Sequence, residues 1–282
     1  MQYTASGPEW ANAILRPTTL HEFAALVERV AGIVLSDEKI SLVQSRLTRR
    51  LRATRINNFE AYLELVRSDL GGEEFHNMLR CLTTNVTKFN REPHHFTDLR
   101  EIVLPRLGGK LESGGKVRIW SSACSTGEEP YSIAMELCEF FPRIESLDVK
   151  ILATDIDASV VSKAKSAEYE SSEIDKLPDP LKKYFDYSKI KNGMKASSKI
   201  SKLIRFKTLN LLDEWPFKGH FDVIFCRNVM IYFNKDTQDR VLCKLINVSQ
   251  KGTRLYIGHS ERLVGEAQQK FRNVGTTTFE RV

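Results

Sequence analysis

The chain has 282 residues, 41% of them hydrophobic and 28% charged, so it can fold around a sizeable core beneath an ordinary polar surface. No apolar run approaches the roughly 18 residues that a membrane-spanning helix needs, and the polar N-terminus lacks the apolar stretch of a secretory signal. Five cysteines without a C-x-x-C pair argue against a disulfide framework, and six histidines without ligand spacing argue against a metal site. We therefore expect a cytoplasmic protein without a bound metal.

The N-terminal part of the chain is predicted to be helical, because no run in its first ~110 residues is rich in β-branched side chains. Thr19 is a candidate N-cap of the first helix, and the Gly71-Gly72 pair separates the last two. The helices are predicted over residues 19–30, 37–55, 59–66 and 73–81. Together they predict a small all-helical domain over residues 1–82.

The helix predicted over residues 37–55 carries a local excess of positive charge. Its apolar stripe consists of Ile40, Val43, Leu47 and Leu51. Lys39 and five arginines add up to +6 between positions 39 and 55, where no acidic residue occurs. A solvated helix face is the ordinary interpretation, whereas a surface for an anionic partner is the alternative. Arg46, Arg49 and Arg50 lie off the apolar stripe, so we expect them to project towards solvent or a cleft.

After a linker over residues 83–115, apolar runs alternate with amphipathic helical stretches, which predicts an α/β domain over residues 116–282 with a mainly parallel sheet. Its strands are predicted over residues 117–120, 149–153, 204–209, 221–226, 255–258 and 277–281. A polar insert over residues 169–203 contains Asn192-Gly193, the signal of a two-residue type I′ hairpin. We expect this insert to form a small antiparallel appendage.

A turn of small residues, 121–127, follows the first strand of the α/β domain and leads into a helix whose first turn holds Glu129 and Pro130. Such a turn lets a ligand approach the backbone at the carboxyl end of the strands. With a single glycine and two carboxylates it is a poor cradle for a pyrophosphate, and it suits a ligand with a positive charge and hydroxyl groups. A simple strand-to-helix turn is the alternative.

Two acidic residues, Asp155 and Asp157, end the second strand. In Rossmann-like domains an acidic residue at this place receives the ribose hydroxyls of a ligand, about 20 residues or somewhat more past the glycine turn. Asp155 lies 155 − 127 = 28 residues after Gly127. We expect Asp155 to be the ribose ligand and Asp157 to cap the next helix.

Residues 82–96 form a polar run between apolar ends, a pattern that a plain interdomain linker also shows. The polar pair Arg227-Asn228 follows the fourth strand, where a parallel sheet presents its active site. These two segments and four others resemble, in the same order, the motifs of chemotaxis receptor methyltransferases of the CheR type. The matching segments are 82–96, 125–132, 155–157, 210–212, 226–233 and 258–261. Asn90 and Cys124 depart from the residues common in that family.

The resemblance implies a protein-glutamate O-methyltransferase that depends on S-adenosyl-L-methionine and releases S-adenosyl-L-homocysteine. It implies a Rossmann-like methyltransferase domain with a small N-terminal all-helical domain and a small antiparallel β insert. The implied substrates are glutamate side chains in the cytoplasmic region of membrane-bound chemoreceptors, methylated for sensory adaptation. We expect a cytoplasmic monomer that neither inserts into the membrane nor binds nucleic acid.

The resemblance also assigns roles to residues of this chain. The cofactor contacts that it implies are Asn85, Thr87, Arg91, Glu129, Asp155, Asn210, Leu211, Asn228 and Val229. Among these, Asp155 acts through the ribose, whereas Asn210 and Leu211 flank the adenine. Arg91 and Tyr232 are the expected catalytic residues beside the reacting methyl group. The expected substrate-binding residues are Arg46, Arg49 and Arg50 of the basic helix, which faces the glutamate-rich methylation region of the receptor.

A glutamate acceptor fits a site without a general base, since a carboxyl group with a pKa of about 4.3 is ionised at neutral pH. In-line attack on the sulfonium methyl mainly requires alignment of the two reactants. Arg91 cannot give up a proton, so its expected role is to orient a carboxylate of the substrate or the cofactor. The turn of the insert carries one glycine and many lysines, so we expect it not to bind a receptor tail.

Two rival functions stay open from the residues alone. A nucleic-acid methyltransferase would use the basic helix to grip phosphates. In amino-group methylases, however, two prolines typically follow the Asn or Asp after the fourth strand. This chain has neither proline. A catalytically silent module would bind the cofactor and dock on receptors as a sensor, but this chain retains both Arg91 and Tyr232.

Overall fold

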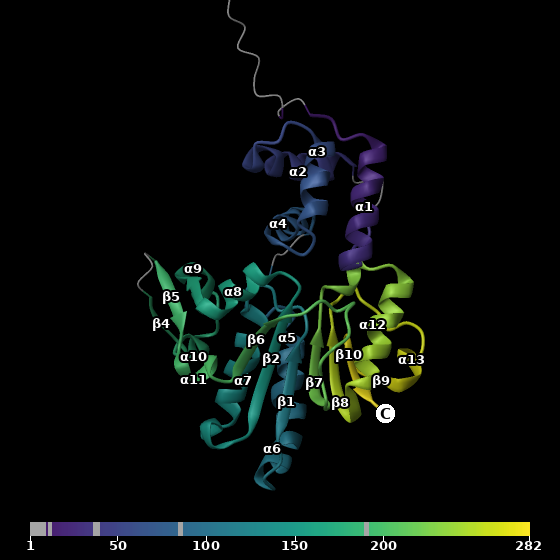
Figure 1. Cartoon of the computed structure of the whole chain (residues 1–282). Helices are drawn as coiled ribbons and strands as arrows, with labels where there is room; N and C mark the ends of the chain where they lie inside the picture. Colours follow the sequence, from purple (N-terminus) through teal and green to yellow (C-terminus); the bar gives the residue numbers. More distant parts are fainter. Residues whose placement is uncertain (1–9, 11–12, 36–39, 84–86, 189–191) are drawn as a thin grey trace, which may run out of the picture. The chain divides into compact units, whose positions relative to one another are not determined.

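The computed structural model describes residues 10, 13–35, 40–83, 87–188 and 192–282. The chain divides into two compact units, Met1–Val86 and Thr87–Val282 (Figure 1). Among the described residues, no helix has the length and apolar character needed to cross a membrane.

In the described part of the smaller unit, four amphipathic helices pack together. They are α1 (Pro17–Ala31), α2 (Ile40–Thr54), α3 (Phe59–Ser68) and α4 (Glu73–Leu82). The first helix begins two residues earlier than the sequence predicts, because a proline opens its first turn, where a missing N–H does no harm. Thr19 is therefore not the N-cap: it is buried inside the helix, and its hydroxyl donates to Glu60 of α3 at 2.9 Å. Residues 36–39, where the second helix was expected to begin, lie outside the described residues.

The larger unit is built on a seven-stranded sheet with the order β6-β2-β1-β7-β8-β10-β9. Its strands are β1 (Val117–Ser121), β2 (Val149–Asp155), β6 (Ile204–Thr208), β7 (Phe221–Cys226), β8 (Ser249–Ile257), β9 (Phe271–Gly275) and β10 (Thr278–Arg281). The strands from β6 to β8 are parallel, whereas β10 and β9 add an antiparallel edge. The chain runs from β1 outwards to β2 on one side and later to β7 on the other, so β1 and β7 flank the switch point at which Rossmann-like sheets bind ligands.

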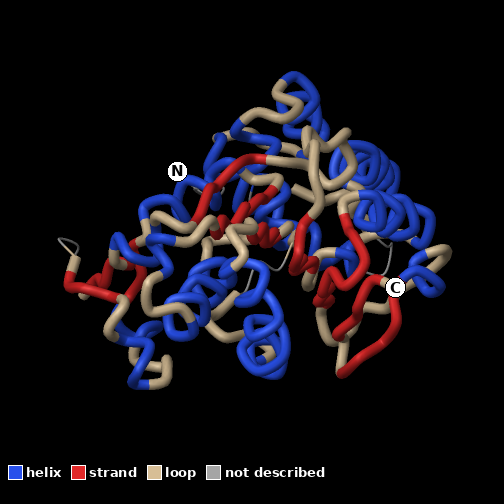
Figure 2. The backbone as a smooth tube through the Cα atoms, turned by 90° about the horizontal axis from the view of Figure 1, so that it is seen from below, coloured by secondary structure: helices blue, strands red, loops and turns tan. Residues whose placement is uncertain are grey.

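Helices cover both faces of this sheet (Figure 2). They are α5 (Pro93–Asp98), a π-helix (Leu99–Val103), α6 (Leu104–Glu112), α7 (Glu128–Phe140), α8 (Ala158–Ser166), α12 (Lys235–Asn247) and α13 (Ala267–Lys270). Side chains alternate along each strand. Ile119 and Phe225 therefore join the core beneath α5 to α8, whereas Trp120 and Ile224 join a second core beneath α12. Residues 93–112, which fall in the expected linker, are thus helices of the larger unit.

The insert after α8 forms its own antiparallel sheet with the order β3-β5-β4, as the sequence indicates. Its elements are β3 (Glu168–Glu170), α9 (Ser171–Ile174), α10 (Asp179–Lys182), β4 (Phe185–Tyr187), β5 (Gly193–Ala196) and α11 (Ser198–Ser201). Tyr187, the last residue of β4, pairs with Met194, and five residues, 188–192, connect β4 to β5. The expected two-residue turn at Asn192-Gly193 is therefore wrong, although Asn192 does take a left-handed backbone at φ 58°. Its neighbours 189–191 lie outside the described residues.

Candidate active site

The carboxyl ends of β1, β2 and β7 meet at one edge of the central sheet. Ser121 at the end of β1 pairs with Ala153 of β2 and with Phe225 of β7. The polar residues that follow these strands therefore gather at this edge, as expected for a parallel sheet. Asp155 and Asn228 both lie there.

The turn between β1 and α7 is held in an unusual backbone conformation. Ser125 and Gly127 have φ values of 47° and 101°. A Cβ atom at Gly127 would lie 2.7 Å from the hydroxyl of Tyr169 and 2.9 Å from the side chain of Ala164, so only glycine fits. The Ser125 N–H donates to Asp155 Oδ2 at 2.8 Å, which fixes the turn against the end of β2.

Asp155 is partly exposed at the end of β2, where the sequence places it. Burial raises the pKa of its carboxyl group, opposed by the backbone N–H groups of Asp157 and Ser125, which both donate to it. Asp157 caps α8 as predicted, since its Oδ1 accepts from the Ser159 N–H at 2.8 Å. Asp157 thus shapes the end of a helix, whereas the Asp155 carboxylate holds the backbone at the end of β2.

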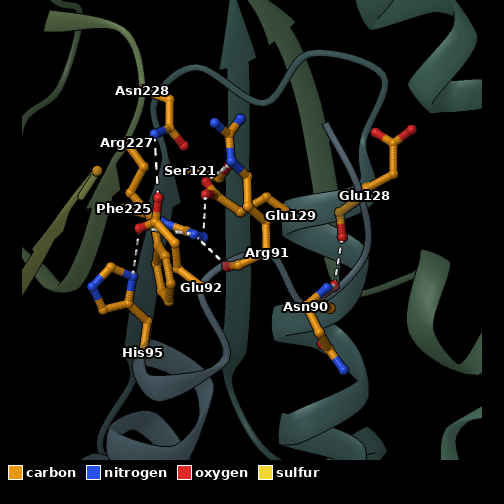
Figure 3. A network of polar contacts seen from close by, with 12 residues as sticks. Asn90, Arg91, Glu92, His95, Ser121, Glu128, Glu129, Phe225, Arg227 and Asn228 are labelled. Carbon is orange, nitrogen blue, oxygen red and sulfur yellow. Dashed lines mark hydrogen bonds and ion pairs between the residues drawn. The ribbon is translucent and has the colours of Figure 1, made fainter. Parts of the chain in front are cut away.

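Arg227 is the buried centre of a polar network (Figure 3). Its guanidinium lies 3.0 Å from Glu129 Oε2 and 3.3 Å from Glu92 Oε2, and it donates to the carbonyl of Arg91. The other oxygen of Glu129 accepts from the Ser121 hydroxyl at 2.7 Å. Glu129, expected to hold the cofactor, is therefore bound on both oxygens within the protein. Its carboxylate pairs with the buried Arg227, since a buried cation needs such partners. The contact of Glu129 with the cofactor stays a prediction.

Arg227 and Glu92 are site residues to which sequence reasoning gave no role. The Arg-Asn pair after the fourth strand and the polar run 82–96 were the available signals, but pairing between them is a tertiary property. Burial by itself would raise the pKa of Glu92, but the charge of Arg227 and hydrogen bonds from Asn228 and His259 lower this pKa to about 2. Glu92 is therefore ionised at neutral pH.

The run that precedes the sheet carries the strain typical of functional segments. Asn90 and Glu92 have left-handed backbones at φ 50° and 59°. The N–H of Asn90 donates to the Ser132 hydroxyl at 3.0 Å, while His95 is fully buried beside Thr277 at 2.9 Å. Burial lowers the pKa of His95 to about 3, so its ring is neutral.

Three residues of the segment 82–96 are expected to contact the cofactor, and the structure describes two of them. Arg91 is partly buried, and its side chain extends beside Glu129 (Figure 3). Thr87 is partly buried at the start of the larger unit. Asn85 lies outside the described residues.

The loop after β7 is shaped by one buried carboxylate, that of Glu261. It accepts backbone N–H groups from Asn228, Val229 and Met230 at 2.7 to 3.0 Å, and it also accepts from two further N–H groups, of Ile231 and Gly258. Asn228 takes φ 57°, and its side chain donates to Glu92 Oε1 at 3.3 Å. Glu261 thus sets the backbone that presents Asn228 and Val229 at the edge of the sheet.

The remaining expected residues border the second core. Tyr232 ends a 3-10 turn (Met230–Tyr232) and is partly buried, as is Val229. Asn210 accepts from the Leu212 N–H at 3.0 Å, which closes a local turn. Leu211 points into the core, so only its backbone is left to border a ligand.

The basic helix α2 differs from its prediction. Arg50 binds Glu74 of α4 through two hydrogen bonds of 3.0 and 2.7 Å, and the Tyr62 hydroxyl donates to the same carboxylate. Arg46 donates to the Leu82 carbonyl at 2.8 Å. Arg46 and Arg50 therefore do not extend freely into solvent, because both tie α2 to α4, and the alternative that they face a cleft stays a prediction. The exposed cations of this helix and its end are Arg49, Arg52 and Arg55, called the basic surface below.

Among the described residues, one group of potential metal ligands lies within 4.8 Å of one another, namely Glu92, His94 and His95. The Glu92 carboxylate is already engaged by Arg227 and Asn228. The positive charge of the Arg227 guanidinium would repel a divalent cation bound there. We therefore assign these three residues to the polar network around Arg227.

Comparison with known proteins gives consistent matches over nearly the whole chain. The model of the CheR methyltransferase SAM binding domain matches residues 85–279, and that of the CheR methyltransferase all-alpha domain matches residues 18–83. A probable chemotaxis protein methyltransferase of Rhizobium etli is 45% identical over 252 residues, covering 88% of this chain and 94% of the relative. The chemotaxis protein methyltransferase of Escherichia coli is 37% identical over 258 residues, covering 90% and 87%.

Matches to solved structures are weaker. A TehB-like SAM-dependent methyltransferase from Corynebacterium glutamicum is 13% identical with a TM-score of 0.35, covering 67% of this chain and 97% of that one. The residues present fit S-adenosylmethionine: Asp155 ends β2, and the side-chain oxygens of Ser125 and Asn90 are buried without a hydrogen-bond partner among the described residues. S-adenosylmethionine is thus the cofactor of the larger unit. With both of its domains matched, the chain belongs to the CheR family of chemotaxis protein methyltransferases.

Proposed function

We propose that the chain transfers a methyl group from S-adenosylmethionine to glutamate carboxylates in the cytoplasmic region of chemoreceptors, which forms methyl esters. When bound, the cofactor supplies an electrophilic methyl group on a positively charged sulfur. The names of the relatives support a role in chemotaxis. The chemistry of the site supports the choice of a carboxylate as the acceptor.

The observation that carries the proposal is how the ionisable groups at the sheet edge are engaged. Glu92 and Glu129 are both bound to Arg227, and the neutral ring of His95 contacts Thr277. Glu92 and His95 are not poised to take up a proton near neutral pH, since their pKa values are about 2 and about 3. Burial raises the pKa of Glu129, but its two oxygens are already engaged by Arg227 and by the Ser121 hydroxyl. An amine acceptor needs a proton acceptor, whereas a glutamate is already ionised.

The cofactor is held, in this proposal, by the residues around the β1–α7 turn and the β7 loop. Asp155 binds the ribose hydroxyls, because its carboxylate keeps acceptor sites beyond the two N–H groups that it binds. Ser125 and Asn90 offer buried oxygens that lack partners among the described residues. The Asn228 and Val229 backbone, set by Glu261, completes the pocket.

Arg91 and Tyr232 are proposed to lie beside the reacting groups. A guanidinium orients a carboxylate by paired hydrogen bonds without any proton transfer. Replacing Arg91 by alanine should therefore lower kcat by about 10²- to 10³-fold, as for the loss of one transition-state donor, and should also weaken cofactor binding, since Arg91 is an expected cofactor contact. Steady-state rates together with calorimetric titration of S-adenosylhomocysteine measure the two effects. Near wild-type kcat in this variant would show that Arg91 is not catalytic.

The chemical nature of the product tests the function itself. The full chain is incubated with methyl-labelled S-adenosylmethionine and a purified cytoplasmic fragment of a chemoreceptor, and the labelled receptor is then treated with alkali. A methyl ester of glutamate is hydrolysed to volatile labelled methanol, whereas a methylated amine keeps its label. Volatile label is the expected result. Label that stays on the receptor after alkali would contradict carboxylate methylation, and unlabelled receptor would favour the silent module.

A further inference from the structure

A second pocket lies at the carboxyl end of β8, apart from the residues assigned to the cofactor. Residues 259–263, α13 and the β9–β10 hairpin enclose about 440 Å³ there. Its walls are apolar where Leu263, Phe271 and Phe279 meet, and its remaining lining is mainly polar. A pocket of this size accommodates an amino-acid side chain with room for its neighbours.

The polar lining is suited to a carboxylate. Arg262 is exposed and makes no ion pair or hydrogen bond with the rest of the described chain, and the same is true of the side chain of Asn273. A guanidinium without a partner favours a carboxylate, while apolar walls favour the methylene stem of an acidic side chain. Glu261 also borders the pocket, but five backbone N–H groups bind its carboxylate and offset its charge.

The rim of the pocket also contacts the polar network of the candidate site. His259 on its rim is 3.2 Å from Glu92 Oε1, and the side chain of Asn228 is 3.3 Å from the same oxygen. Glu92 Oε1 therefore contacts both His259 on the rim of the pocket and Asn228, a proposed cofactor residue. On a helix, side chains three or four residues apart are about 5–6 Å from each other, so two neighbouring side chains of one helical substrate can reach both places.

We propose that this pocket receives a second acidic side chain of the receptor, one helical turn from the glutamate that is methylated, and that Arg262 binds its carboxylate. The inference rests on the proposed function and adds a specificity determinant to it. The pocket selects which glutamates are methylated, because an acceptor without an acidic neighbour on the same helix face leaves Arg262 unpaired.

Charge reversal at Arg262 tests the inference. Initial rates of Arg262→Glu are measured against the concentration of a purified receptor fragment, with Arg240→Glu as the matched control. Arg240 is an exposed cation of α12 that does not line the pocket. The expected result is a KM for receptor raised roughly tenfold at low ionic strength, with kcat and the affinity for S-adenosylhomocysteine unchanged. Asn273→Asp should raise KM in the same direction.

A substrate variant makes the test specific. Replacing the acidic residue one turn from the methylated glutamate by lysine should raise KM for the wild-type enzyme and restore it for Arg262→Glu. Equal KM values for Arg262→Glu and Arg240→Glu would overturn the inference, as would a loss of S-adenosylhomocysteine affinity in Arg262→Glu. If the wild-type enzyme forms no alkali-labile methyl product, the proposed function fails first, and the inference fails with it.

Discussion

Single residues at the sheet edge act mostly through other residues of the chain. Glu129 binds Arg227, Arg227 binds Glu92, and Glu92 in turn contacts Asn228 and His259. The buried charge of Arg227 is stable only with such partners, so these contacts mainly fix the shape of the site. Asp155 is different, because the hydrogen bonds of its carboxylate come from backbone N–H groups.

Asp155 should therefore be the most sensitive residue for cofactor binding. Asp155→Ala removes a charged acceptor, and loss of such hydrogen bonds weakens binding by roughly 10- to 100-fold. Titration calorimetry with S-adenosylhomocysteine measures the change. Asp157→Ser is the matched control, since serine keeps the helix cap while it removes the neighbouring charge. Equal affinities of the two variants would refute the ribose assignment.

The buried His95 should make the protein sensitive to acid. Its folded pKa of about 3 lies below the ordinary value of 6.5, so the unfolded state binds a proton first as the pH falls. The contribution of His95 to stability is therefore complete above pH 6.5 and is lost between pH 6.5 and 3, by up to about 1.4 kcal/mol per pH unit. The depressed pKa of Glu92 adds a second loss between pH 4.5 and 2.

Urea unfolding at pH 7, 6, 5 and 4 separates these two groups. His95→Gln should flatten the dependence between pH 6.5 and 4.5, the window in which Glu92 does not yet titrate in either state. An unchanged slope in that variant would show that His95 does not cause the loss.

At the scale of elements, the periodicity of apolar residues predicts the helices and strands that bury one face. It contains no information on the contacts between these elements. The strand β7 is buried at every position and was predicted with its correct bounds. By contrast, β9 was missed, since it is exposed everywhere beyond Phe271 and shows no alternation. In the same way the apolar stripe of α2 was predictable, but the commitment of Arg50 to Glu74 required knowledge of α4.

The basic surface of α2 should therefore be probed at its exposed cations. The triple reversal Arg49→Glu, Arg52→Glu, Arg55→Glu should raise KM for receptor roughly tenfold at low salt and much less at high salt, because several weak pairs act together and salt screens them. Cofactor affinity should not change. Normal methylation with no salt dependence would indicate a merely solvated helix face. Arg50→Ala is unsuited to this test, since it removes the counter-ion of the partly buried Glu74 and destabilises the helical unit.

At the scale of the molecule, the two compact units correspond to the two matched family domains. The sequence was sufficient for the parallel sheet, the helical domain and the place of Asp155, because each follows from local pattern and chain order. It was insufficient for the network around Arg227, which joins residues more than 130 positions apart.

Ligand binding should stabilise the larger unit by mass action. At a concentration 100 times its Kd, S-adenosylhomocysteine adds about 2.7 kcal/mol, which corresponds to roughly 5 to 10 °C for a unit of this size. Differential scanning calorimetry with and without the ligand measures the shift in Tm. The Asp155→Ala variant serves as the control and should shift far less. No shift for the wild type would contradict cofactor binding in this unit.

The dependence of the β7 loop on Glu261 has a consequence for protein engineering. The N–H groups of residues 228–231 all bind a side chain that lies about 30 positions later, beyond β8. A chimera that receives only the β7 loop of a relative gains the backbone N–H donors of that relative without the carboxylate that binds them. Segments 226–233 and 258–261 therefore form one exchangeable module, although a strand and a helix separate them in the chain.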